Sequence, residues 1–256
     1  MTTPPSTHRL IVPGAQLYYE IRGSGPLLLV IGQPMTSAAF GPLADLLAEH
    51  RTVVTYDPRG LGQSTVEDPS LDVTPEVQAD DLAQLVDAVG GGPTDVLASS
   101  GGAVAGLALA ARHPDRVANL VAHEPPVTEL LPDAPHVRAA VDDIEDAYRS
   151  GGSEAAWGKF VSLVVHDGPV PEAGVPLTTW PPEDADADTA DTAAAEAGQQ
   201  VPDVQDAAAP PVPQRTAKDQ ADDELFFLRN AEAVHAVRAD CGRAALGPPA
   251  GDDRRR

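Results

Sequence analysis

The chain has 256 residues, the size of one large domain, and a formal net charge of −22. This excess of acidic residues argues against nucleic acids and anionic membranes as partners, because both require a cationic protein surface. The single cysteine, Cys241, excludes an intramolecular disulfide, and no spacing of cysteine and histidine predicts a metal site. We expect no cofactor.

The sequence also bears on location. No segment has the apolar length of a membrane span, so no membrane partner is expected. Residues 1–9 are rich in threonine and proline and lack the apolar core of a signal peptide. These features predict a cytoplasmic protein.

Short strands and one helix are predicted in the first quarter of the chain. They are a hairpin of residues 9–12 and 16–21, a strand at 26–31, a helix at 40–49 and a strand at 51–56. The strand at 26–31 is a continuous apolar run, as in strands that are buried on both faces of a parallel sheet, and the strand at 51–56 is expected to be buried as well.

The next segment continues the alternation of helix and strand. Thr74 is placed to cap the N-terminus of a helix with Pro75 in its first position, and three glycines at 90–92 end that helix. A strand at 94–97, a helix at 103–112 and a strand at 117–122 follow. This order predicts a mostly parallel sheet with helices on both faces.

The pattern changes after Pro125 and Pro126. Helical periodicity at 137–148 and 153–164 is typical of a helical cap inserted over the loop end of a sheet. Residues 167–214 contain ten acidic residues, many prolines and no lysine or arginine, so we expect them to be largely disordered. The expected organisation is a core at 1–125, a cap at 126–230 that ends in a helix at 216–229, and a disordered tail at 231–256.

The pentapeptide at residues 98–102, Ala-Ser-Ser-Gly-Gly, lies between an apolar run and an alanine-rich helix. It predicts a nucleophile elbow, a tight strand-to-helix turn with Ser100 as the nucleophile. Such a turn requires small residues two places before and two places after the serine, and Ala98 and Gly102 meet that requirement. The backbone N–H of Gly101, at the positive end of the following helix, would face a developing oxyanion.

Together with two further motifs, the elbow resembles the α/β-hydrolase superfamily over residues 8–230, most closely its small actinobacterial serine hydrolases. The motifs are Ile31-Gly32-Gln33-Pro34 after the third strand and the segment from Tyr56 to Ser64 after the fourth. The resemblance implies an α/β-hydrolase fold and makes Gln33 the second oxyanion donor beside Gly101. In this sequence isoleucine occupies position 31, where the family usually has histidine. The segment from Asp57 to Ser64 is expected to shape a loop through its glycines and carries no predicted chemistry.

The identity of the residue in the elbow distinguishes two classes of reaction in this family. Relatives that open epoxides or remove halide use aspartate there, because they form an alkyl-enzyme ester, whereas serine indicates acyl transfer. The expected substrate is a small-molecule ester or similar acyl compound, cleaved through an acyl-enzyme. Hydrolysis of a carbon–carbon bond, or a lyase reaction, on the same elbow is an alternative.

Ser100 needs a histidine base, and that histidine needs a carboxylate to orient it. Glu124, at the end of the sixth strand, is the candidate acid, although family members also place the acid after the seventh strand. Glu124 as a structural residue at the cap entry is the alternative, and His123 is expected to be a packing residue. The other histidines before residue 230 are all predicted to be structural. They are His8, His50, His113, His136 and His166.

The family's base lies in a loop after the eighth strand, and no such segment is recognisable here. After Asn230 only His235 remains, followed by a tail rich in proline, glycine and arginine. We hypothesise that the C-terminal part of the fold is missing or frame-shifted from near Asn230, which leaves about six strands. The sixth strand would then be an apolar edge open to self-association. A catalytically dead binding protein, or a truncated product, is therefore the rival to an active hydrolase.

Overall fold

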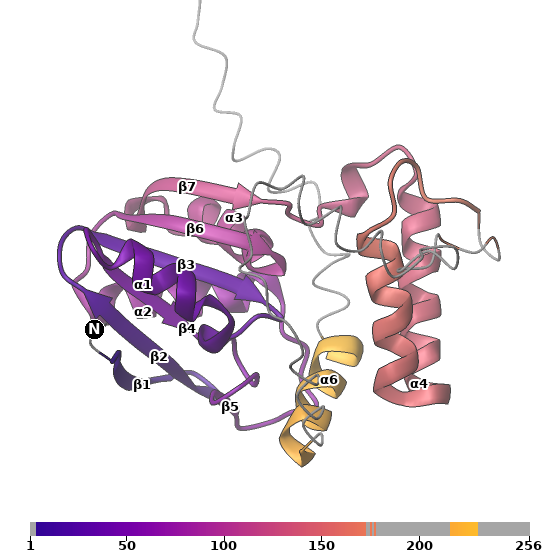
Figure 1. Cartoon of the computed structure of the whole chain (residues 1–256), viewed down its shortest axis with the longest axis horizontal. Helices are drawn as coiled ribbons and strands as arrows, with labels where there is room; N and C mark the ends of the chain where they lie inside the picture. Colours follow the sequence, from indigo (N-terminus) through magenta and orange to yellow (C-terminus); the bar gives the residue numbers. More distant parts are fainter. Residues whose placement is uncertain (1–3, 173–174, 176, 178–215, 230–256) are drawn as a thin grey trace, which may run out of the picture. The chain divides into compact units, whose positions relative to one another are not determined.

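The computed structural model describes residues 4–172, 175, 177 and 216–229, and these contain one sheet of seven strands (Figure 1). The strands are β1 (Ser6–Val12), β2 (Ala15–Gly23), β3 (Leu27–Gln33), β4 (Thr52–Tyr56), β5 (Thr65–Val66), β6 (Thr94–Ser100) and β7 (Val117–His123). The strand order is β1-β2-β4-β3-β6-β7, and the short β5 pairs with β2.

The sheet has a parallel part and an antiparallel part. β4, β3, β6 and β7 run parallel to one another, whereas β1 and β2 form an antiparallel hairpin and β2 is antiparallel to β4. The predicted α/β architecture with a mostly parallel sheet is therefore confirmed. The sequence reasoning missed β5, because a two-residue strand carries no periodicity.

The helices agree with the predicted positions within a few residues. They are α1 (Gly41–Leu47), α2 (Pro75–Val89), α3 (Gly101–Arg112), α4 (Ala134–Val164) and α6 (Ala217–Arg229), with 3-10 turns η1 (Ser37–Phe40), η2 (Pro114–Arg116) and η3 (Thr128–Leu130). The Thr74 hydroxyl caps α2 by accepting a hydrogen bond of 3.4 Å from the N–H of Val77, and Pro75 is the first helical residue. None of the described helices is both long enough and apolar enough to span a membrane.

Helices cover both faces of the sheet, with α1 on one face and α2 and α3 on the other (Figure 1). Consecutive residues of β3 alternate between the two cores. Leu29 and Ile31 pack in the cluster with α2 and α3, and Val30 packs in the cluster with α1. This explains the continuous apolar run in β3, because the side chains of residues 27–31 all pack in one or the other of these two clusters.

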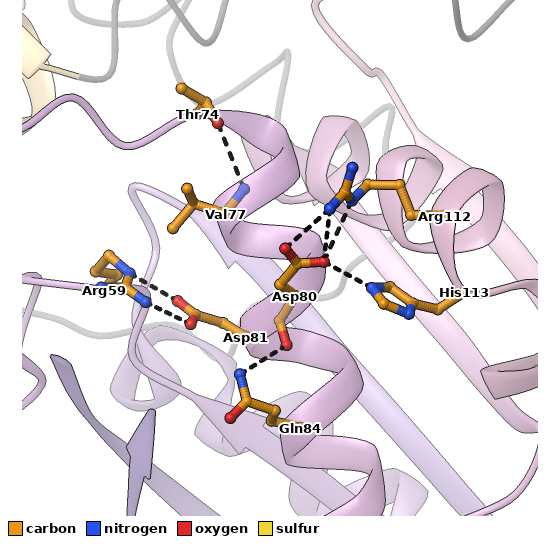
Figure 2. A network of polar contacts seen from close by, with 8 residues as sticks. All are labelled: Arg59, Thr74, Val77, Asp80, Asp81, Gln84, Arg112 and His113. Atoms are coloured by element: carbon orange, nitrogen blue, oxygen red, sulfur yellow. Dashed lines mark hydrogen bonds and ion pairs between the residues drawn. The ribbon is translucent and has the colours of Figure 1, made fainter. Parts of the chain in front are cut away.

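Two adjacent aspartates of α2 make different ionic contacts (Figure 2). Asp81 is buried and forms an ion pair with Arg59 at 2.6 Å; burial raises the pKa of Asp81, and Arg59 opposes that rise. Asp80 is half-exposed and contacts Arg112 and His113 at the end of α3. Partial burial acts to raise the pKa of Asp80, but hydrogen bonds from His113 and Arg112 outweigh it, so the pKa is lowered.

The chain divides into two compact units, and the second comprises residues from Pro135 to Gln220. Its main element is α4, which is two helices in succession, separated at Gly152, where φ is 74°. The break confirms the two predicted helical segments at 137–148 and 153–164. An ion pair between Lys159 and Asp143 joins the two halves of α4, and His136 Nδ1 lies 2.9 Å from the carbonyl oxygen of Val170.

The first unit comprises the sheet and, from Ala221 onward, α6. Leu225 of α6 packs with Leu61 and Val73 from the connection between β4 and α2. An Asp222 carboxylate oxygen accepts a hydrogen bond of 3.0 Å from the N–H of Gly62. Most of the segment at 167–214 that is predicted to be disordered lies outside the described residues, as do the predicted tail at 231–256 and His235.

Candidate active site

Ser100 lies where β6 passes into α3, in a backbone conformation that is rare for a residue with a side chain. Its φ is 53° and its ψ is −129°. Conformations of this kind cost of order 1–3 kcal/mol and persist only where the surrounding structure enforces them. Among the described residues only Ser100 and Glu124 combine a side chain with a positive φ.

Close backbone packing enforces the turn at Ser100. A Cβ atom on Gly102 would lie 2.5 Å from Gly32 Cα, so no residue other than glycine fits between α3 and β3 at this point. Ala98, two residues before Ser100, is completely buried. The requirement for small residues that the elbow motif predicts therefore has a direct cause in the contact between α3 and β3.

The two predicted oxyanion donors are adjacent to Ser100. Gln33 ends β3, is 5% exposed and is the register partner of Ser100 in the neighbouring parallel strand. Gly101 begins α3, where the unpaired N–H groups and the helix dipole favour negative charge. A Cβ atom on Gly101 would lie 3.1 Å from the Gln33 carbonyl oxygen. The fold thus brings Gln33, Ser100 and Gly101 together from β3, β6 and α3.

Asp57, which follows β4 directly, organises the loops beside this group. Its buried carboxylate accepts hydrogen bonds from the N–H and Oγ–H of Ser37, at 2.8 and 2.6 Å, and from the N–H of Gln63 at 2.7 Å. Sequence reasoning expected glycines to shape this segment, and Gly60 and Gly62 do have positive φ. It missed the role of the carboxylate, which a polar residue directly after a buried strand could have indicated.

Glu124 and His123 lie at the end of β7, the strand next to β6. His123 is the register partner of Ser99, and its Nδ1 lies 3.3 Å from the Ser99 hydroxyl oxygen. The expectation that His123 is a packing residue is wrong, because its side chain is exposed on a strand that has β6 as its sole partner within the described chain. Glu124 is also exposed, and its φ is 48°.

No histidine of the described residues donates to or accepts from the Ser100 side chain. Four of them have other contacts, namely His8 stacked on Tyr19, His113 at Asp80, His136 at the Val170 carbonyl and His166 at the Pro169 carbonyl. His50 is exposed after α1. Within residues 4–172 and 216–229, no three potential metal ligands gather into a group that could hold a metal ion.

Comparison with known proteins identifies the fold family of the chain. A family model described as the alpha/beta hydrolase fold matches residues 25–229. "Uncharacterized hydrolase YraK" of Bacillus subtilis is 37% identical over 146 residues, 57% of this chain and 54% of that protein. "Putative carbamate hydrolase RutD" of Caulobacter vibrioides is 36% identical over 145 residues, 54% of this chain and 52% of that protein. The chain spans about half the length of these curated relatives.

A solved structure of similar fold covers more of the chain. It is titled as a putative epoxide hydrolase from Pseudomonas aeruginosa, has a TM-score of 0.62 and 20% sequence identity, and covers 95% of this chain and 75% of that one. At this identity the likeness concerns the fold alone. The elbow at Ser100, the sheet order and the match of the family model over residues 25–229 agree, and the chain belongs to the α/β-hydrolase fold family.

Proposed function

We propose that the chain is a serine hydrolase that cleaves esters or similar acyl compounds through an acyl-enzyme. The observation that carries the proposal is the backbone of Ser100, with φ of 53° and ψ of −129° at the junction of β6 and α3. A strained serine at the carboxyl end of a central parallel strand is what nucleophilic catalysis on this fold requires.

In the proposed reaction the Ser100 oxygen attacks the carbonyl carbon and loses its proton to a base. The carbonyl oxygen becomes an oxyanion, which accepts hydrogen bonds from the N–H groups of Gln33 and Gly101. Each such donor is typically worth about 3 kcal/mol of transition-state stabilisation. Collapse of the tetrahedral intermediate breaks the bond to the leaving alcohol, which takes up the proton, and water then hydrolyses the Ser100 ester by the reverse sequence.

Glu124 is the proposed acid that orients the base. Two observations support it: the carboxylate follows β7, the neighbour of β6, and its backbone has a positive φ like that of Ser100. None of the described histidines hydrogen bonds to Ser100, so none of them is proposed as the base, and His235 lies outside the described residues. Without a base the remaining rate would rest on the oxyanion donors and on substrate binding.

The test is covalent labelling of the full chain with a fluorophosphonate probe, followed by intact mass measurement and peptide mapping. We expect one probe per chain, bound at Ser100, and no labelling of Ser100→Ala. Ser99→Ala is the matched control, since it removes the neighbouring hydroxyl and leaves the proposed nucleophile in place. A panel of nitrophenyl esters and carbamates then measures turnover.

The second candidate is a binding protein that keeps the fold and has lost the reaction. It is favoured by one observation, that no described histidine hydrogen bonds to Ser100. In that case the folded wild-type chain would resist the probe, and Ser100→Ala would bind small acyl compounds as tightly as the wild type does. Labelling at Ser100 with measurable turnover would exclude this candidate.

A further inference from the structure

We propose that Asp57 is a positioning residue for the oxyanion donor at Gln33. Its carboxylate fixes the loop that leaves β3, so that the Gln33 N–H stays directed at the site of the developing charge. This inference rests on the proposed serine hydrolase function and adds to it a residue that does not touch the substrate.

The first support is the set of bonds that Asp57 makes. Asp57 and Ser37 are each 2% exposed, so their contacts are shielded from water. One carboxylate oxygen accepts from both the N–H and the hydroxyl of Ser37, and the other accepts from the N–H of Gln63. Hydrogen bonds to a charged acceptor are about twice as strong as neutral ones. Removal of the carboxylate would leave two buried donors of Ser37 and the part-buried N–H of Gln63 without this partner.

The second support is the position of Ser37 in the chain. Ser37 begins η1, four residues after Gln33, so the segment between them is short and held at both ends. Its start is paired to β6 through the register of Gln33 with Ser100. Its other end is bonded to Asp57. A displacement at Ser37 is therefore transmitted to the peptide of Gln33 through only a few residues.

The third support is the tight packing of the two loops. A Cβ atom on Gly62 would lie 2.4 Å from Asp57 Oδ2 and 2.9 Å from Thr36 Cγ2, so the loop after β4 lies directly against the loop after β3. Asp57 is itself fixed to β2. Its N–H donates to the Tyr18 carbonyl at 2.9 Å, and the Ser64 hydroxyl donates to the Asp57 carbonyl at 2.7 Å. The carboxylate is thus a rigid reference point.

The size of the expected effect follows from the sensitivity of catalysis to geometry. A misplacement of a reacting or stabilising group by 1 Å costs on the order of 100-fold in rate. Asp57→Ala should allow such a shift of the Gln33 peptide without changing any group that binds the probe. The loss should appear in the first-order rate of phosphonylation and leave the dissociation constant of the initial complex within about twofold.

The experiment measures both constants for the fluorophosphonate on the full chain, at a temperature where every variant is folded by circular dichroism. Expected decreases in the phosphonylation rate are about 10- to 100-fold for Asp57→Ala. Smaller decreases are expected for Ser37→Ala, which removes one bond, and for Asp57→Asn, which keeps an acceptor toward Ser37. These two variants test the proposal if Asp57→Ala does not fold.

Asp81→Ala is the matched control. Asp81 is as buried as Asp57, at 2% exposed, and its loss also breaks charged hydrogen bonds, but they run to Arg59 and not to the loop after β3. Asp81→Ala should lower thermal stability and leave the phosphonylation rate unchanged. Equal decreases for Asp57→Ala and Asp81→Ala, or no decrease for any Asp57 or Ser37 variant, would overturn the proposal.

Hydrogen exchange separates this inference from the proposed function. In Asp57→Asn the amides of Gln33 and of residues 35–37 should exchange faster than in the wild type, whereas those of residues 94–98 in β6 should not. If the wild-type chain does not label at Ser100, the proposed function fails, and the exchange data still decide whether Asp57 fixes the loop. Unchanged exchange at Gln33 and residues 35–37 would contradict the role of Asp57.

Discussion

The two sides of the candidate active site differ in how their residues are held. On the side of β3, β4 and β6, Gln33 and Asp57 are buried and Ser100 is confined by the contact of Gly102 with Gly32. On the side of β7, His123 and Glu124 are exposed. The first side presents the proposed nucleophile and the proposed oxyanion donors through backbone geometry, and the second offers side chains at a sheet edge.

This difference shows where each part of the proposed chemistry is encoded. The groups that would stabilise charge are fixed by main-chain packing, so few substitutions can alter them without unfolding the turn. The groups that would orient a base are side chains with solvent around them. Substitutions on the first side should therefore change stability and reactivity together, and substitutions on the second side should change reactivity alone.

The largest effect is expected from Gly102→Ala. The added Cβ would meet Gly32 Cα at 2.5 Å, so α3 or β3 must move. We expect a loss of about 1–3 kcal/mol in the free energy of unfolding and loss of fluorophosphonate labelling. Urea denaturation and mass measurement test both. Gly41→Ala in the same unit, where the new Cβ meets only an Arg22 side-chain nitrogen at 3.8 Å, should change neither.

Glu124→Gln tests the exposed side. The charge is removed from a solvent-exposed position, so the melting temperature should stay within about 2 °C of the wild type, as usual for surface substitutions. If Glu124 orients the base, ester turnover should fall by roughly 100-fold or more. Glu49→Gln, an exposed glutamate after α1, is the control and should retain full turnover. Equal turnover in both variants would remove Glu124 from the site.

The two outer strands of the sheet allow a test of self-association. Val121 of β7 is 58% exposed and Ile11 of β1 is 78% exposed, and these strands end the order β1-β2-β4-β3-β6-β7. Exposed apolar edges favour pairing with another chain, and a lysine opposes it. We expect concentration-dependent association in sedimentation velocity that Val121→Lys reduces, and Ile11→Lys measures the contribution of the opposite edge in the same way. A monomer at all concentrations would contradict this expectation.

The smallest effect concerns Asp80, whose contacts with Arg112 and His113 are drawn in Figure 2. The hydrogen bonds from His113 and Arg112 hold its pKa below the ordinary value. A lowered pKa in the folded state contributes stability above the ordinary pKa of aspartate, about 3.9, and that stability is lost as pH falls through the lowered value. Asp80→Asn should therefore be slightly less stable than the wild type at pH 7, and this difference should disappear as the pH falls through the lowered pKa, as measured by thermal melts.

Much of the core could be predicted from local sequence patterns. The capped start of α2 at Thr74 and the break of the cap helices near Gly152 both depend on neighbouring residues, and both are confirmed. The position of Gln33 beside Ser100 required knowledge of strand order, which the resemblance supplied. The bonds of Asp57 to Ser37 could not be predicted, because they join loops 20 residues apart and no pattern in either loop indicates the other.

The exposure of His123 has a similar explanation. The alternation of apolar and polar residues in a strand assigns each residue to one of two faces of the sheet. It does not indicate whether a helix covers that face at the end of the strand. His123 lies at the last position of β7, where the described chain adds no covering side chains. The positive φ of Glu124 also could not be predicted, because residues in that conformation are usually glycine or asparagine.

The contact between Gly32 and Gly102 has a consequence for redesign of the site. Because backbone meets backbone there, and a Cβ on Gly32 would also lie 2.6 Å from the Phe40 ring, a combinatorial library should keep both glycines fixed. The proposed oxyanion donor of Gln33 is a main-chain N–H, which a side-chain substitution would keep, but the side chain is buried, so the library at position 33 should contain only residues of similar size. Substrate preference could then be evolved at 33 and 99 without altering the turn that presents Ser100.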